Sequence, residues 1–200
     1  MPFSECGPKE IAHLNRRDKR LGAAIERIGM IRREIRPEPF SALVSSVISQ
    51  QISKKAAATV WDRLSSRVGT IRPETIAGVS LAEIQSCGMS MKKAGHIQAI
   101  ATAAISGVLD FDSLPTFSDA EVIKKLSSLN GVGIWTAEML LIFSLGRPDV
   151  VSYGDLAIRR GMMNLYDLKE LSREKFDSYR QWYSPYGSVA SLYLWELSVL

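Results

Sequence analysis

The chain of 200 residues has little cysteine, with only Cys6 and Cys87. Two cysteines cannot by themselves form a zinc or iron–sulfur site, and so few are typical of a reducing compartment. Apolar residues make up 46% of the chain, yet no apolar run is long enough to span a membrane. The first residues also lack the basic start and apolar core of a signal peptide. We therefore expect an intracellular, soluble protein without a membrane partner.

Strong charge of one sign is also missing. The formal net charge of +4 is only mildly basic. Many positive charges occur in adjacent pairs, and each pair alone indicates no more than a solvated helix face. Lys54-Lys55 and Arg159-Arg160 are of more interest, because both stand at predicted helix starts, where a basic pair can approach nucleic acid.

Strand patterns are absent as well, because no stretch alternates between apolar and polar residues over a useful length. Apolar residues instead recur with helical spacing through most of the chain, most clearly over residues 40–48. Capping boxes at Ser80/Glu83 and Ser118/Glu121 mark the starts of further helices. The sequence therefore predicts an all-α protein, and it excludes a doubly wound nucleotide-binding fold.

One stretch, residues 126–161, combines a helix, a glycine turn, a second helix and an isolated carboxylate. Asn130-Gly131-Val132-Gly133 interrupts a helical pattern, which resumes at Ile134. Two glycines around a small apolar residue allow the chain to turn within about four residues. Such a turn before a helix N-terminus aims several backbone N–H groups at one point, which suits a phosphate oxygen.

The carboxylate of this stretch is Asp155, which precedes a new helical pattern at Leu156. The helix dipole favours the ionised form of an aspartate at such a place. Most aspartates so placed only cap a helix, and a Gly-x-Gly turn alone is also common. The separate features thus leave open a purely structural interpretation.

Taken together, Leu129-Asn130-Gly131-Val132-Gly133-Ile134-Trp135-Thr136-Ala137 and Asp155 resemble the helix-hairpin-helix DNA glycosylase superfamily. The resemblance is greatest to the branch that excises alkylated purines, the 3-methyladenine DNA glycosylase II type. Some members of the superfamily carry a four-cysteine iron–sulfur cluster near the C-terminus. No cysteine follows Cys87 here, so that cluster is not expected.

The resemblance implies a helix-hairpin-helix glycosylase fold of two helical lobes, with the active cleft between them. One lobe would be residues 39–147, with the helix-hairpin-helix at about 126–145. The other would be residues 1–38 and 148–200, and it would carry Asp155.

A second similar stretch contains Gln50-Gln51-Ile52-Ser53. On packing alone, the two glutamines would only fill a polar turn. The family has Gln-Gln-x-Ser in a loop at the DNA minor groove, where one side chain fills the gap left by an extruded nucleotide. The matching residue is Gln51. The resemblance further implies DNA contacts by these residues: Gln50, Ser53, Gly131, Val132, Gly133 and Thr136.

Two more stretches extend the resemblance. Residues 87–94 are similar to a family segment that we interpret as scaffold, with Lys92 or Lys93 at most touching phosphate. In the tail, Tyr186 matches an aromatic residue that lines the base pocket of relatives. The tail departs from the family pattern at Gly187, where arginine is usual.

The resemblance implies base flipping and hydrolysis of the N-glycosidic bond. Asp155 would stabilise positive charge on the sugar. Trp135, Met139 and Tyr186 would line the pocket, where an aromatic wall gains about 0.5–2 kcal/mol on a cationic purine. Bifunctional relatives carry a nucleophilic lysine at the position of Trp135. Water is therefore the expected nucleophile, and an abasic site the product.

The expected partners are double-stranded DNA with damaged bases and a downstream abasic-site endonuclease, and the protein is expected to be a monomer. No cofactor is expected except a Na⁺ or K⁺ ion on the backbone carbonyls of Leu129 and Val132. Two other functions stay open. One is a non-catalytic DNA-damage-binding protein of the same fold, which has no need of Asp155. The other is a glycosylase for deaminated or oxidised bases.

Overall fold

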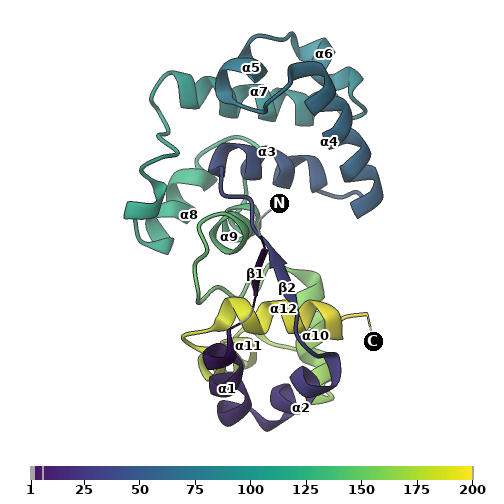
Figure 1. Ribbon diagram of the computed structural model, residues 1–200, viewed down its shortest axis with the longest axis vertical. Helices are drawn as coiled ribbons and strands as arrows, with labels where there is room; N and C mark the ends of the chain where they lie inside the picture. The colour runs from purple at the N-terminus through teal and green to yellow at the C-terminus, as the bar shows by residue number, and fades with distance from the viewer. Residues whose placement is uncertain (1–2, 6, 200) are drawn as a thin grey trace. The chain divides into compact units, whose positions relative to one another are not determined.

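The computed structural model describes residues 3–5 and 7–199 (Figure 1). These residues form two compact units, a central unit of residues 36–140 and a terminal unit of residues 1–35 and 141–200. The family resemblance predicts the corresponding boundaries at residues 39 and 147. Within the described part of the chain, no helix is long and apolar enough to cross a membrane.

The central unit consists of helices. They are α3 (Pro39–Ser49), α4 (Lys54–Val68), α5 (Pro73–Ala77), α6 (Leu81–Ser86), α7 (Met91–Ile105), the 3-10 helix η1 (Leu114–Thr116), α8 (Asp119–Ser127) and α9 (Ile134–Phe143), whose last three residues belong to the terminal unit. Helix α7 packs against α3, α5 and α6. The apolar residues that predicted these helices form the core between them, with Leu43, Ile97 and Leu126 fully buried.

Side-chain caps start most helices of the central unit. Both predicted capping boxes are confirmed. The side chains of Ser80 and Ser118 accept from the backbone N–H groups of Glu83 and Glu121, and the two glutamate carboxylates accept from the backbone N–H groups of the serines. Each box satisfies two donors that a helix N-terminus would otherwise leave without partners.

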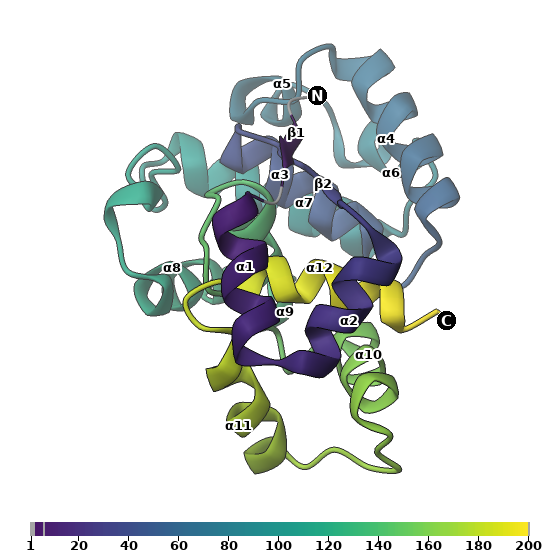
Figure 2. The ribbon, with the colours of Figure 1, turned by 60° about the horizontal axis from the view of Figure 1, so that its bottom comes forward.

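The terminal unit is built from both ends of the chain. Its elements are β1 (Phe3–Glu5), α1 (Pro8–Arg17), α2 (Lys19–Ile28), β2 (Arg32–Glu34), α10 (Leu156–Tyr166), α11 (Arg173–Tyr183) and α12 (Gly187–Leu197). Helix α12 is almost wholly buried and packs against α2, α10 and α11 (Figure 2). Helices α10 and α12 pack so closely that a Cβ added at Gly161 would lie 1.9 Å from the carbonyl oxygen of Leu194.

The two strands are the only described departure from an all-α chain. They pair antiparallel, with Phe3 opposite Glu34 and Glu5 opposite Arg32. The sequence pattern does not predict these strands, because three residues are too few to establish an alternation.

A buried polar cluster joins three helices of the terminal unit. Asp18 caps α2 through the backbone N–H groups of Arg20 and Leu21, at 2.9 and 3.1 Å. Its other carboxylate oxygen accepts from the Tyr166 hydroxyl, which lies 2.8 Å from the Tyr183 hydroxyl. Burial raises the pKa of both tyrosines, so the two hydroxyls stay protonated and available for these hydrogen bonds.

Candidate functional site

The glycine turn between α8 and α9 has the predicted form. Six residues connect the end of α8 at Ser127 to the start of α9 at Ile134, and the backbone N–H of Val132 donates to the carbonyl of Leu129 at 3.1 Å. Val132, which belongs to the turn, is buried. The turn opens directly onto the N-terminal end of α9, where a helix presents its first backbone N–H groups.

The two glycines of the turn have different roles. Gly131 has a φ of +85°, a conformation that favours glycine, and an added Cβ would lie 2.1 Å from Nδ1 of His96. Gly133 is exposed, and no atom lies within 4 Å of the place where its Cβ would be. The fold therefore requires glycine at 131 and leaves 133 open for a close approach from outside.

Gln50, at the C-terminal end of α3, is bonded to this turn. Its side-chain amide donates to the carbonyl of Gly131 at 3.0 Å and to Oγ1 of Thr136 at 3.2 Å. Thr136 is only 2% exposed. These bonds give both side chains a role in the protein itself, and a direct DNA contact by either one stays a prediction.

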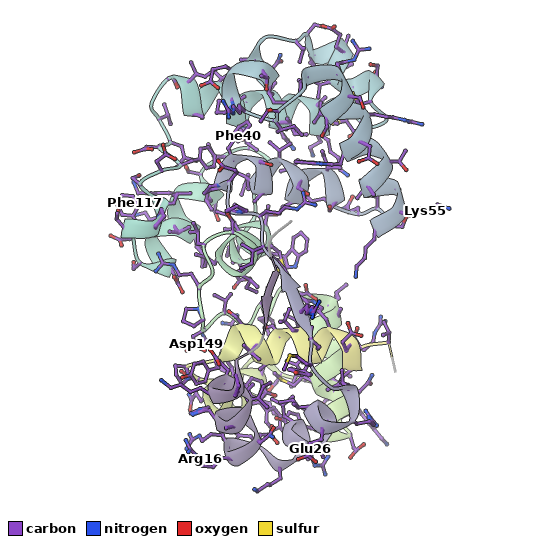
Figure 3. All side chains as sticks on the ribbon, in the orientation of Figure 1. Arg16, Glu26, Phe40, Lys55, Phe117 and Asp149 are labelled. Atoms are coloured by element: carbon purple, nitrogen blue, oxygen red, sulfur yellow. The ribbon has the colours of Figure 1, made fainter. Side chains whose placement is uncertain are left out.

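The next residue, Gln51, is exposed and has a φ of +58°. This left-handed conformation is uncommon for a residue other than glycine and occurs often at functional positions. Ser53 caps α4, because its hydroxyl accepts from the backbone N–H of Ala56 at 3.2 Å. In the first turn of α4, Lys55 extends away from the rest of the unit (Figure 3). An exposed glutamine thus stands beside a basic helix start.

Asp155 occupies the N-cap of α10, as the sequence predicts. One carboxylate oxygen accepts from the backbone N–H groups of Ala157 and Ile158, at 2.9 and 3.0 Å. The residue is 8% exposed, and Val150 and Val151 before it are buried. Two N–H donors and the positive end of the helix dipole stabilise the negative charge of this carboxylate.

Trp135 and Met139 lie four residues apart on α9, so they share one face of that helix. Trp135 is partly buried and Met139 is buried. Tyr186, in the terminal unit, is partly buried and meets the ring of His13 edge-on, with the centroids 5.2 Å apart. Their contact with a base stays a prediction.

Close packing at the N-terminal end of α12 explains the glycine at position 187. Asp149 lies beside the N-terminal end of α12 (Figure 3), where it accepts from the backbone N–H of Gly187 at 3.1 Å and from the Ser184 hydroxyl at 2.6 Å. A Cβ at position 187 would lie 2.6 Å from that carboxylate and 2.7 Å from the Val151 side chain. A larger residue, such as the arginine usual in the family, does not fit this arrangement.

Lys93 has a structural role that no sequence pattern indicates. Its ammonium donates to the carbonyl of Ile48 at 2.8 Å and to that of Gln50 at 2.6 Å. Burial lowers the pKa of this ammonium. Its partners lie more than forty residues away in the sequence, so no local pattern could have indicated the contact.

The described residues hold no group of three or more His, Cys, Asp or Glu side chains that could bind a metal ion. The predicted Na⁺ or K⁺ site uses backbone carbonyls instead. The Leu129 carbonyl accepts one hydrogen bond within the turn. A carbonyl oxygen has two lone pairs, so this one can also face a cation.

The sequence and fold together define the class of the protein. Residues 44–185 match the model of the HhH-GPD superfamily of base excision DNA repair proteins, and the chain belongs to this family. This confirms the resemblance based on the hairpin and Asp155.

Particular relatives are similar over most of their length. The DNA-3-methyladenine glycosylase 1 of Schizosaccharomyces pombe is 34% identical over 168 residues, which are 82% of this chain and 74% of the relative. A crystal structure of a DNA-3-methyladenine glycosidase from Bacillus halodurans superposes with a TM-score of 0.85 at 37% identity, covering 99% of this chain and 93% of that one. The structure of an S. pombe 3-methyladenine DNA glycosylase in complex with abasic DNA has a TM-score of 0.85 at 32% identity, covering 96% of this chain and 97% of that one.

Proposed function

We propose that this protein is a DNA glycosylase that hydrolyses the N-glycosidic bond of alkylated purines, of the 3-methyladenine and 7-methylguanine type, in base excision repair. The observation that carries the proposal is that a chain of the HhH-GPD family has both the glycine hairpin and an aspartate at the N-cap of α10. Relatives named 3-methyladenine glycosylases support the choice of substrate.

The hairpin would anchor the DNA backbone. Exposed Gly133 lets a phosphate come close to the backbone N–H groups at the start of α9. Leu129 and Val132 would offer carbonyl oxygens to a Na⁺ or K⁺ ion, which would supply positive charge beside that phosphate. Gln51 would enter the duplex where the damaged nucleotide leaves the stack, and so offset part of the few kcal/mol that flipping costs.

Asp155 would act on the sugar. As the C1′–N bond breaks, its electron pair leaves with the base, and positive charge develops on the sugar. The ionised carboxylate stabilises that charge, and water then supplies the hydroxyl group at C1′. An alkylated purine is cationic and leaves as a neutral base, so the reaction needs no strong general acid.

The pocket would favour a cationic base. Trp135 would offer an aromatic face, and Met139 a polarisable side chain, to the flipped purine. Tyr186 would be a further aromatic contact for the base. Tryptophan at position 135 cannot form an imine with C1′, so the product would be an intact strand with an abasic site. We propose that the protein acts as a monomer on damaged double-stranded DNA and leaves strand cleavage to an abasic-site endonuclease.

A lesion panel tests the proposal. Duplexes with one 3-methyladenine, 7-methylguanine, hypoxanthine, uracil or 8-oxoguanine are incubated with the protein, and base release and alkali-labile sites are measured. We expect release of the alkylpurines, no nick before alkali, and no adduct after borohydride. Binding without release would indicate a damage-binding protein. Release of only deaminated or oxidised bases would contradict the alkylpurine assignment. A trapped adduct would contradict water as the nucleophile.

A further inference from the structure

Three segments that are distant in the sequence meet within the central unit at one lysine. Lys93 comes from the first turn of α7, Ile48 and Gln50 from the end of α3, and Gln50 in turn bonds to the hairpin. All of these contacts lie inside residues 36–140. They join the loop that carries Gln51 to the turn that carries Gly133.

The end of α3 explains why a lysine is required. The last carbonyls of a helix lack intrahelical donors and form the negative end of its dipole. Helix α3 has no basic residue in its own last turn. Lys93 supplies the missing cation from another helix, and its two hydrogen bonds to Ile48 and Gln50 hold the backbone on both sides of the helix end.

This backbone anchor orients the two neighbouring glutamines differently. Gln50 turns inward, and its amide reaches the Gly131 carbonyl and the Thr136 hydroxyl. Gln51 then turns outward through its left-handed backbone. His96 is three residues beyond Lys93 on the same helix, and its ring lies against Gly131. Helix α7 thus supports the loop and the hairpin together.

We propose that Lys93 is a positioning residue that holds the exposed Gln51 and the phosphate-binding hairpin in one fixed geometry, so that both engage the same stretch of DNA. The consequence for DNA rests on the function proposed above. In this role Lys93 acts through Gln50 and does not itself bind a phosphate. The sequence predicts a scaffold role for residues 87–94, with at most a phosphate contact for Lys93, and the structure gives this lysine specific partners at the end of α3.

Lys92 provides a matched control. It is the preceding residue on α7, it carries the same charge, and its side chain is exposed. Lys92→Met and Lys93→Met therefore remove equal charge from one helix turn, but only the second removes the donor at the end of α3. Lys93→Arg keeps a cation that can still donate to carbonyls.

Hydrogen exchange in the free protein tests the support itself. The N–H groups of Ile52 and Val132 donate within their own turns, to Ser49 and Leu129. In Lys93→Met we expect both amides to exchange about tenfold faster, although they lie eighty residues apart. Lys92→Met should match the wild type. Unchanged exchange of the Val132 amide in Lys93→Met would overturn the proposal, whatever the protein does with DNA.

DNA binding tests the consequence. We measure affinity for a duplex with a tetrahydrofuran abasic site and determine the active fraction by titration, so that partial misfolding is not mistaken for weak binding. Lys93→Met should weaken binding about tenfold and Lys92→Met less than about twofold, with Lys93→Arg between them. Adding Gln50→Ala to Lys93→Met should cause little further loss, because both variants break one network.

The possible failures are distinguishable. Equal losses in Lys92→Met and Lys93→Met would mean that Lys93 contributes only charge. Fully additive losses in the Gln50→Ala, Lys93→Met double variant would mean that the two residues act separately. Either outcome overturns the positioning role. If the wild type does not bind the duplex, the proposed function fails, while the exchange measurement still decides whether Lys93 supports the hairpin.

Discussion

The hairpin of the central unit and the carboxylate of the terminal unit are held in contrasting ways. The Gly131 carbonyl accepts from Gln50, which is 81 residues away, and the His96 ring leaves no room for a Cβ at position 131. Asp155 is held by backbone groups only two and three residues further along the chain. The cap bonds of Asp155 can therefore be kept while its charge is removed, whereas a Cβ at Gly131 disturbs a contact with a distant helix.

The largest effect is expected at Asp155. In Asp155→Asn, the amide oxygen can still accept from Ala157 and Ile158, because asparagine caps helices as well as aspartate does. The negative charge is lost. Excision of an alkylated base in single-turnover assays should fall about a thousandfold, while duplex affinity stays equal or rises.

Asp167→Asn is the matched control for Asp155→Asn. Asp167 is an exposed residue at the C-cap of α10, and its side chain forms a surface ion pair with Arg20. This variant should excise at the wild-type rate. A wild-type rate in Asp155→Asn as well would exclude Asp155 as the catalytic residue.

The two hairpin glycines give the next largest effect. The Cβ of Gly133→Asp meets no described atom within 4 Å, and position 133 is exposed, so the melting temperature should stay near that of the wild type. Duplex affinity at low salt should nevertheless fall about a hundredfold, because the new side chain and its charge meet the DNA backbone.

Gly131→Ala should behave in the opposite way to Gly133→Asp. The added Cβ meets His96 and the backbone is strained, so unfolding should become easier by about 1–3 kcal/mol. Thermal melts and DNA titrations of both variants separate the two effects. Unchanged affinity in Gly133→Asp would count against the hairpin as the DNA anchor.

A smaller effect is expected at the exposed loop. Gln51→Ala should slow excision from duplex DNA about tenfold, because the side chain acts on the flipping equilibrium, while excision from a single-stranded lesion changes little. Gln51→Gly should show the same loss, although glycine adopts the left-handed backbone without strain. Equal losses on both substrates would contradict a role in flipping.

The smallest effect concerns the N-cap of α8, at the end of that helix opposite the hairpin. Hydrogen bonds from Ser118 lower the pKa of Glu121, and those from Ser80 lower the pKa of Glu83. A carboxylate with a lowered pKa stabilises the fold above its ordinary pKa of 4.5, and this stabilisation is lost as the pH falls through the lowered value. Ser118→Ala should therefore lower the melting temperature slightly at pH 7, and the difference from wild type should shrink in acid. Excision at neutral pH should not change.

The sequence by itself determined the features whose bonds join near neighbours. The all-α class follows from helical spacing, and both capping boxes join residues three apart. The glycine turn and the N-cap at Asp155 are equally local. These patterns were sufficient to identify the family, because its signature lies almost entirely in such short stretches.

Only the tertiary structure decided which side chains support those stretches. It turned Gln50 inward toward Gly131, placed Lys93 at the end of α3, and packed Gly187 against Asp149. It also paired β1 with β2. The partners in these contacts are separated by tens of residues. Whether such residues meet depends on how the helices pack, and the residue spacing within one segment carries no information about that packing.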